Sequence, residues 1–200
     1  MAKNPTKLEA PLKYKVLTVL PVVYRKWASL RNTSLEAWTH SWQEEELHSV
    51  KGGAQVAWWT TALRLETFHM KHVSVTGGSA DLQKAFDEIL RKLLYELLRL
   101  AGFPERVLIA YISFQECLTV YNAVGEGVGL HYHRSCSIPQ GCPLSMDFMA
   151  FLMRPWVLMM KSINAHPMVL ADDILVSISG VDSFERFKRI FEATIKYRED

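Results

Sequence analysis

The chain has 200 residues, of which 49% are hydrophobic and 22% are charged. This composition excludes an intrinsically disordered chain, and the length suffices for one domain, or two tightly joined subdomains, with a real core. The net charge of +2 does not indicate a large independent surface for nucleic acid.

The cysteines and the two most apolar segments indicate the cellular compartment in which the chain is expected to fold. Cys117, Cys136 and Cys142 are odd in number and lack metal-ligand spacing, which favours a reducing, intracellular environment without separating nucleus from cytoplasm. Residues 16–23 are too short for a signal peptide, and residues 144–160 contain charges and a proline. We therefore expect core elements and no membrane contact.

The N-terminal third is expected to be mainly helical. Residues 1–12 are predicted to be a loose N-terminal lead-in. Residues 15–23 are predicted to form a buried strand, and residues 24–42 to be largely helical with mixed spacing. A helix is predicted for about residues 54–68. Its core-facing side is predicted to hold Val56, Trp59, Leu63 and Leu65.

In the middle of the chain, residues 72–82 are predicted to form a strand that ends near Asp81. Gly77-Gly78 is poor strand material and suggests a bulge or a break. A leucine-rich amphipathic pattern predicts a helix from Phe86 that stops at Gly102. A second helix and a hairpin are expected next, over residues 104–117 and 118–137.

The last third is predicted to contain a helix from about Pro143, a hairpin with Asp172-Asp173 at its tip, and a helix that begins at Asp182. The whole order gives an α+β class: a small antiparallel sheet with helices packed on one face.

Three polar segments interrupt this pattern. Asp172-Asp173 lies inside an apolar run, where two carboxylates are costly to bury. A divalent cation would offset that cost, but a plain Asp-Asp turn between two strands would look similar. The other two segments are Asp81-Leu-Gln-Lys-Ala-Phe-Asp87 and Ile138-Pro-Gln-Gly-Cys-Pro-Leu-Ser145.

Taken in chain order, the three segments resemble motifs A, B and C of a reverse transcriptase. Their residue sequences are most similar to those of non-LTR (LINE-type) retroelement enzymes. The resemblance implies a polymerase palm, a ferredoxin-like antiparallel sheet with helices on one face, over residues 73–200. It implies partial fingers over residues 13–72. Because the chain ends just after a helix that resembles motif D, we expect no thumb, and further domains of a longer polyprotein are expected partners.

The resemblance also implies the chemistry. An RNA-directed DNA polymerase moves a nucleotide from a dNTP to a primer 3′-OH on an RNA template, with two Mg²⁺ ions, for which Mn²⁺ can substitute. Asp81, Asp172 and Asp173 match the catalytic carboxylates. The same three residues and the carbonyl of Leu82 match the metal ligands.

Four more residues match nucleotide or template positions of the family. Phe86 corresponds to the ring beneath the sugar that disfavours a 2′-hydroxyl, and Gln140 and Gly141 correspond to the turn near the templating pair. Lys15 stands where a basic residue contacts template or triphosphate. Both segments also have a structural interpretation. By periodicity alone, Phe86 is the first core residue of the next helix, and Pro-Gln-Gly only marks the boundary at which a helix begins.

A basic strip near the N-terminus is a candidate phosphate-contacting surface or, equally, a solvated edge of the fold. It consists of Lys13, Lys15, Arg25, Lys26 and Arg31.

The main alternative is a catalytically inactive retroelement remnant that binds only RNA or another protein. In that case Asp172-Asp173 is a turn and needs no metal. An RNA-directed RNA polymerase would share the aspartates, but Phe86 and the second segment disfavour it. Leu170 stands where the family usually has an aromatic residue, which removes a primer-side contact but no metal ligand.

Overall fold

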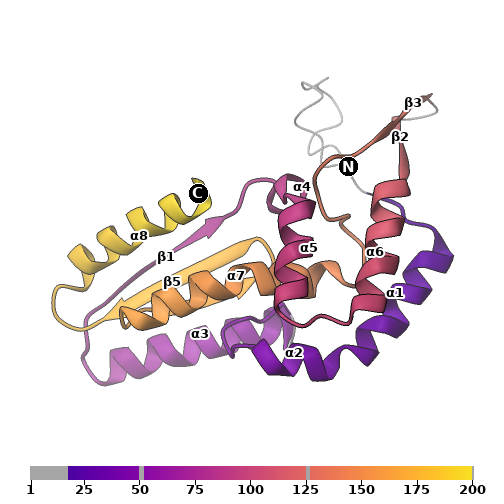
Figure 1. Ribbon diagram of the computed structural model, residues 1–200. Coiled ribbons are helices and arrows are strands. Elements are labelled where there is room, and N and C mark those ends of the chain that lie inside the picture. Colours follow the sequence, from indigo (N-terminus) through magenta and orange to yellow (C-terminus); the bar gives the residue numbers. More distant parts are fainter. Residues whose placement is uncertain (1–17, 50–51, 125–126, 200) are drawn as a thin grey trace.

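The computed structural model describes residues 18–49, 52–124 and 127–199. Within these residues the chain forms eight helices and five strands. Figure 1 shows helices around a three-stranded sheet, with a separate two-stranded hairpin that projects from the body. In this part of the chain, no helix has the length and apolar character that a membrane span requires.

The first helix replaces part of a predicted strand. α1 (Val22–Ser34) begins directly after Pro21, and α2 (Glu36–Trp42) follows it. Proline suits a helix start because its φ is already helical and its missing N–H is not needed there. The strand predicted for residues 15–23 is therefore wrong over residues 18–23: residues 18–21 form no strand, and Val22 and Val23 are exposed helix residues. Residues 15–17 lie outside the described part.

The helix α3 (Gly53–Met70) confirms the prediction for residues 54–68 but not its core-facing side. Its fully buried residue is Ala57, whereas Trp59 is 53% exposed. Apolar residues occur all around this helix, so periodicity does not select a face, and the small Ala57 allows the closest approach. The four residues predicted to face the core are all exposed: Val56, Trp59, Leu63 and Leu65.

Strand β1 (Val75–Asp81) runs through Gly77-Gly78 with unbroken register, so the predicted bulge or break is wrong. Both glycines allow close packing. A Cβ on Gly78 would lie 2.8 Å from the Phe187 ring, and one on Gly77 would lie 3.0 Å from the Cβ of Ser177. The lack of side chains here makes room for the neighbouring strand and helix.

The helix predicted from Phe86 forms in two pieces, α4 (Ala85–Glu88) and α5 (Arg91–Leu100), because residues 89 and 90 are extended. The carbonyl of Ile89 accepts a hydrogen bond from the N–H of Ser137 at 2.9 Å, which holds this break in place. The next helix, α6 (Glu105–Cys117), begins after Pro104 as predicted.

The second half of the chain follows the predicted order. The hairpin of β2 (Thr119–Val124) and β3 (Gly127–His133) is confirmed, with a register shift between Tyr121 and Ala123. The elements that follow are α7 (Ser145–Ser162), β4 (His166–Leu170), β5 (Asp173–Ser179) and α8 (Ser183–Glu199).

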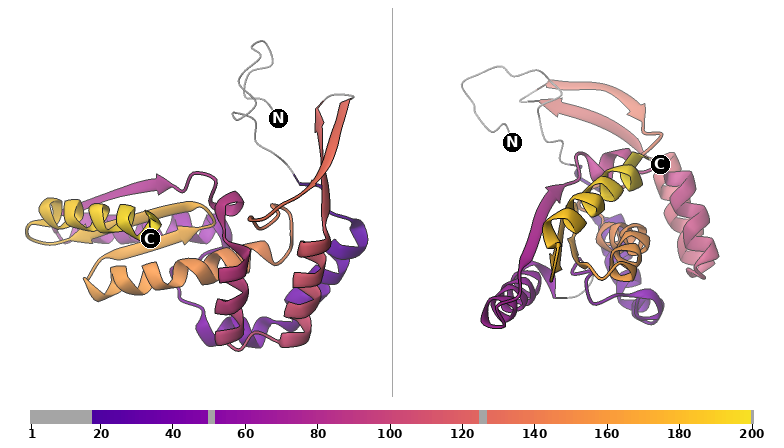
Figure 2. Two further views of the ribbon diagram at one scale, coloured as in Figure 1. Left: turned by 45° about the horizontal axis from the view of Figure 1, so that its top comes forward. Right: turned by 90° about the vertical axis from the view of Figure 1, so that its left-hand side faces the viewer.

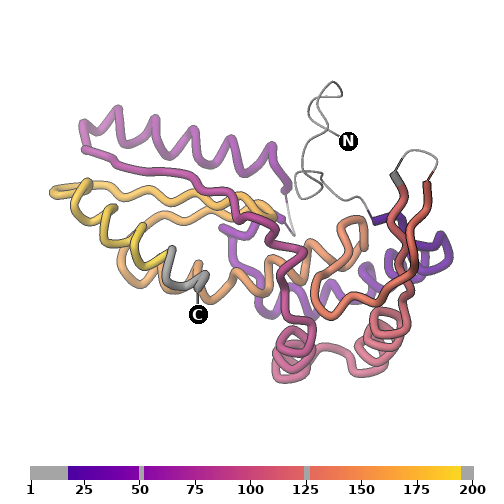
Figure 3. Tube along the Cα trace, turned by 90° about the horizontal axis from the view of Figure 1, so that it is seen from above, coloured from indigo at the N-terminus to yellow at the C-terminus, as the bar shows by residue number. Residues whose placement is uncertain are grey.

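The main sheet is antiparallel in the order β1-β5-β4, which confirms the α+β class. One face carries Gly78 and Val176 and packs against α7 and α8. On the other face, His166 contacts Phe68 of α3, with ring centroids 5.4 Å apart. Figures 2 and 3 show α3 and α8 on opposite sides of the strands, so α3 adds a layer to the predicted single helical face.

Helix α7 joins two hydrophobic cores. Phe148, near its start, packs with residues of α1, α5 and α6, while Trp156 and Met160 pack with β4, β5 and α8. Phe151 and Trp38 contact both clusters. The sheet and the N-terminal helices are thus connected through one buried helix.

Candidate active site

The three predicted catalytic aspartates lie at one end of the sheet, here called the acidic end. Asp81 ends β1 and is the register partner of Asp173, the first residue of β5. Residues directly opposite each other on antiparallel strands have Cα atoms about 5 Å apart and project to the same face. Asp172 lies in the two-residue turn between β4 and β5, next to the pair of Leu170 and Asp173.

Two hydrogen bonds hold the turn that carries Asp172. The N–H of Leu82 donates to the carbonyl of Asp172 at 2.9 Å, which joins the end of β1 to the turn. The N–H of Ala171 donates to the hydroxyl of Ser49. Ala171 has a φ of 58°, the left-handed conformation of tight hairpin turns. The backbone at the acidic end is therefore rigidly framed.

The side chains at this end are accessible oxygen donors. Asp81 and Asp173 are exposed and Asp172 is half-buried. The carbonyl of Leu82 accepts a hydrogen bond from Ala85 at 3.2 Å and retains a second lone pair. Carboxylate and carbonyl oxygens are the ligands that Mg²⁺ prefers, so the donor set fits such an ion.

Among the described residues, no three His, Cys, Asp or Glu side chains lie close enough together to hold a metal ion. The framed backbone nevertheless places Asp81 and Asp173 opposite each other.

The segment around Phe86 meets the turn that contains Gln140 and Gly141. The carbonyl of Phe86 accepts a hydrogen bond from the N–H of Ile138 at 2.8 Å. Phe86 itself is buried, with 7% of its surface exposed. The structure thus brings Phe86 close to the second predicted segment, as expected for either the nucleotide position or a core residue.

The turn itself leaves Gln140 half-buried and Gly141 exposed. Gly141 has a φ of 97°, a left-handed conformation that favours glycine. Lys15 lies outside the described residues, as does Lys13. The rest of the basic strip, Arg25, Lys26 and Arg31, is exposed on α1.

Comparison with known proteins decides the family. The family described as "Reverse transcriptase (RNA-dependent DNA polymerase)" matches residues 2–199. The chain belongs to the reverse transcriptase family. A search of curated proteins found no match.

The fold is also similar to that of a solved telomerase structure. An apo telomerase from Candida tropicalis, truncated from its C-terminal domain, superimposes with a TM-score of 0.58 at 15% sequence identity. The match covers 85% of this chain and 38% of the telomerase chain, so this chain spans well under half of that protein. At this identity the likeness concerns the fold alone.

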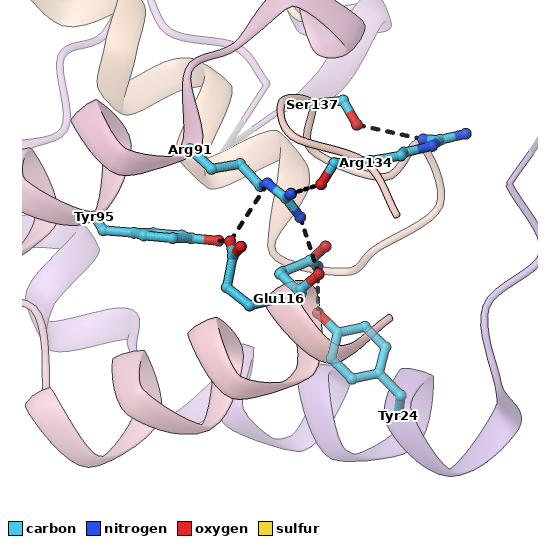
Figure 4. Close-up of polar contacts among 7 residues, drawn as sticks. Tyr24, Arg91, Tyr95, Glu116, Arg134 and Ser137 are labelled. Carbon is cyan, nitrogen blue, oxygen red and sulfur yellow. Dashed lines mark hydrogen bonds and ion pairs between the residues drawn. The ribbon is translucent and has the colours of Figure 1, made fainter. Parts of the chain in front are cut away.

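A buried arginine supports the region between the hairpin and the second reverse transcriptase segment. Arg91 at the start of α5 is 3% exposed, and Figure 4 shows its guanidinium between α6 and the chain after β3. It donates to the carbonyl of Gln115 at 2.9 Å and to the carbonyl of Arg134. Its Nε lies 3.5 Å from the carboxylate of Glu116.

The same network continues to the turn of Gly141. Arg134 donates to the hydroxyl of Ser137 at 3.3 Å, and the hydroxyl of Tyr24 lies 3.1 Å from the thiol of Cys142. Burial, followed by the nearby Cys142, raises the pKa of Tyr24 far above its usual value, and burial also raises the pKa of Cys142. Both groups therefore stay neutral at physiological pH and act as structural hydrogen-bonding groups.

Arg91 was missed by the sequence predictions, although a signal existed. It falls on the buried side of an amphipathic helix, in line with Leu94 and Leu98, where a charge is unexpected. A buried charge requires partners, and here they are the carbonyls of Gln115 and Arg134 and the carboxylate of Glu116. Arg91 is thus a positioning residue for the chain that leads into the Gln140-Gly141 turn.

Proposed function

We propose that this chain is the polymerase domain of a retroelement-type RNA-directed DNA polymerase that adds a dNTP to a primer 3′-OH. The observation that carries the proposal is the register of Asp81 opposite Asp173, with Asp172 in the adjoining turn. Carboxylates from two separate segments, framed by one sheet, suit a reaction in which charge develops on both attacking and leaving oxygens.

The proposed ligands of two Mg²⁺ ions, with Mn²⁺ as a substitute, are Asp81, Asp172, Asp173 and the carbonyl of Leu82. When bound, such ions stabilise the developing charge on the two oxygens. The chain's own residues position the reactants: the sheet orients the carboxylates, Phe86 supports the sugar, and the Gln140-Gly141 turn approaches the templating pair. Lys15 is proposed to contact template or triphosphate. The proposed partners are an RNA template, a DNA primer and a dNTP.

Primer extension on an RNA template tests the proposal. We expect Asp172→Asn and Asp81→Asn to lower the rate on the order of a hundred- to a thousandfold, because the charge that supports the transition state is lost. Glu192→Gln, which removes an exposed carboxylate on α8, serves as the matched control and should retain the wild-type rate.

The alternative is an inactive remnant that binds only RNA or another protein, and direct measurement of Mn²⁺ binding distinguishes it. An active polymerase should bind Mn²⁺ in the wild-type chain and more weakly after Asp172→Asn. No extension, together with Mn²⁺ affinity that is equal in the two proteins, would instead establish the remnant.

A further inference from the structure

A second polar site lies at the opposite end of the sheet from the aspartates. It is a cavity of about 470 Å³, here called the basic pocket, formed where β4 begins and β5 ends. Six residues of its lining determine its chemistry: Glu46, Arg64, Lys161, His166, Ser179 and Arg186. Because β5 is seven residues long, the pocket lies about 20 Å along the strand from Asp173.

The charges in the lining do not cancel. Arg64, Lys161 and Arg186 are cationic and Glu46 is the one anionic residue of the lining, so three positive charges minus one leave +2 with His166 neutral. Lys161 neutralises Glu46, since its ammonium lies 3.2 Å from that carboxylate and 3.2 Å from the carboxylate of Glu44. Two guanidinium groups therefore remain as the excess.

The Arg186 guanidinium is oriented by backbone carbonyls. It donates to Ser179 at 3.4 Å and to Ile163, just after α7, at 3.2 Å. A guanidinium has five N–H donors, so these two bonds fix its plane and leave donors for a further acceptor. Carbonyl partners satisfy hydrogen bonds but leave the positive charge of Arg186 uncompensated.

Arg64 provides the second guanidinium. It is half-buried on α3, and it makes no hydrogen bond or ion pair to another residue in the described part of the chain. Burial, and then the charge of Arg64, lower the pKa of His166, with Glu46 acting in the opposite direction. Burial also lowers the pKa of His48; Glu46 opposes this shift, and Arg64 adds to it. An arginine that lowers the pKa of two neighbouring histidines projects its positive potential into this region.

Neutral hydrogen-bonding groups complete the pocket. The Nε2 of His166 lies 3.5 Å from the hydroxyl of Ser179, and both side chains are half-buried on the face of the sheet covered by α3. Such groups can donate to an acceptor without adding charge. The combination of two guanidinium groups that form no ion pair within the described residues with neutral donors in a concave site is the chemistry that recognises oxyanions.

We propose that the basic pocket binds a phosphate-type oxyanion. Arg64 and Arg186 would supply charge-assisted hydrogen bonds, and His166 and Ser179 would supply neutral ones. The anion is either a backbone phosphate of a nucleic acid or a free phosphate, since both present the same oxygens. This site is independent of the polymerase proposal, because none of its residues belongs to the acidic end.

Calorimetric titration of the full chain with inorganic phosphate at low ionic strength tests the site. We expect Arg64→Gln to weaken phosphate binding by about tenfold, because one charge-assisted hydrogen bond is lost. Arg189→Gln removes an equal charge from an exposed position on α8 and should bind as the wild type does. Arg64→Lys keeps the charge and should give an intermediate affinity, which covers the case in which Arg64→Gln fails to fold.

Equal losses in Arg64→Gln and Arg189→Gln, or no phosphate binding by the wild type, would overturn the proposal. A parallel titration with a short single-stranded oligonucleotide identifies the source of the anion. If Arg64→Gln also weakens this binding, the natural anion is a nucleic-acid phosphate; if it weakens only phosphate binding, the anion is small and free. Asp172→Asn should bind phosphate normally, so the two proposals fail separately.

Discussion

The two ends of the three-stranded sheet differ in how their polar groups are assembled. At the acidic end, Asp81, Asp172 and Asp173 come from a strand end and a tight turn that are hydrogen-bonded to each other. At the basic end, Arg64, His166 and Arg186 come from three elements that only packing brings together. The acidic end therefore depends on backbone register, whereas the basic end depends on how α3 and α8 are placed around the sheet.

The largest expected effect concerns Phe86, beside the acidic end. Phe86→Ala should lower the free energy of unfolding by about 3–5 kcal/mol, because a buried ring is replaced by a cavity. Phe86→Leu keeps most of the volume and should cost less than about 1.5 kcal/mol. Urea unfolding measures both.

Sugar selectivity separates the two roles of Phe86. If the ring lies beneath the nucleotide, both variants should raise ribonucleotide incorporation on an RNA template, even though Phe86→Leu stays folded. Unchanged selectivity in Phe86→Leu would leave Phe86 as a core residue only.

A buried carboxylate provides a contrast to the exposed ones. Asp147, in the first turn of α7, is 8% exposed, and burial raises its pKa to about 6, with the hydrogen bond to Asn32 acting in the opposite direction. The folded chain therefore holds this proton between about pH 4 and pH 6, where the unfolded chain has lost it. The contribution of Asp147 to stability should fall by about 3 kcal/mol over that window as pH rises, and stay constant above it.

Urea unfolding of the wild type and Asp147→Asn at pH 4, 5, 6 and 7.5 checks this expectation. The variant should lack that part of the pH dependence and should gain stability relative to the wild type at pH 7.5. If the unfolding free energies of the two proteins depend on pH in the same way, burial does not raise the pKa of Asp147.

The strand that links the two ends gives the next effect. Gly78→Ala should cost about 1–3 kcal/mol, since the new Cβ would lie 2.8 Å from the rigid Phe187 ring and force β1 or α8 to shift. Gly129→Ala in β3 is the matched control, because its Cβ would meet only a carbonyl oxygen at 3.5 Å. Thermal melting distinguishes them, and equal melting temperatures would contradict the close contact.

The smallest effects should have opposite signs at the two ends. Asp173→Asn should stabilise the fold by a few tenths of a kcal/mol, because like charges face each other across β1 and β5. Lys161→Gln should destabilise it by about 0.5 kcal/mol, because the hydrogen bonds of Lys161 to Glu44 and Glu46 outweigh its desolvation and raise its pKa. Both changes in unfolding free energy should shrink in high salt. Changes of the same sign for the two variants would contradict the predicted electrostatic contrast between the two ends of the sheet.

Local patterns predicted most elements because each depends on neighbours in the chain. The helices α5 and α6 and the hairpin of β4 and β5 follow from apolar periodicity, proline and turn residues. The predictions failed where local preference conflicts with packing. Val22 and Val23 favour a strand by type but follow Pro21 in a helix, and α3 is apolar on all sides, so its buried face was predicted wrongly.

By itself, the sequence determined the family, the order of the elements and the aspartates at a strand end and a hairpin tip, since motifs A, B and C are contiguous segments. Only the tertiary structure decided that Arg91 holds the carbonyl of Arg134, that Phe187 packs on Gly78, and that Arg64 and Arg186 share a pocket. The physical reason is distance along the chain. The strand ends and the β4–β5 turn arise from neighbouring residues. The pairing of Asp81 with Asp173 joins residues 92 positions apart, and the other contacts join residues 43 to 122 positions apart, so both exist only once the chain has folded.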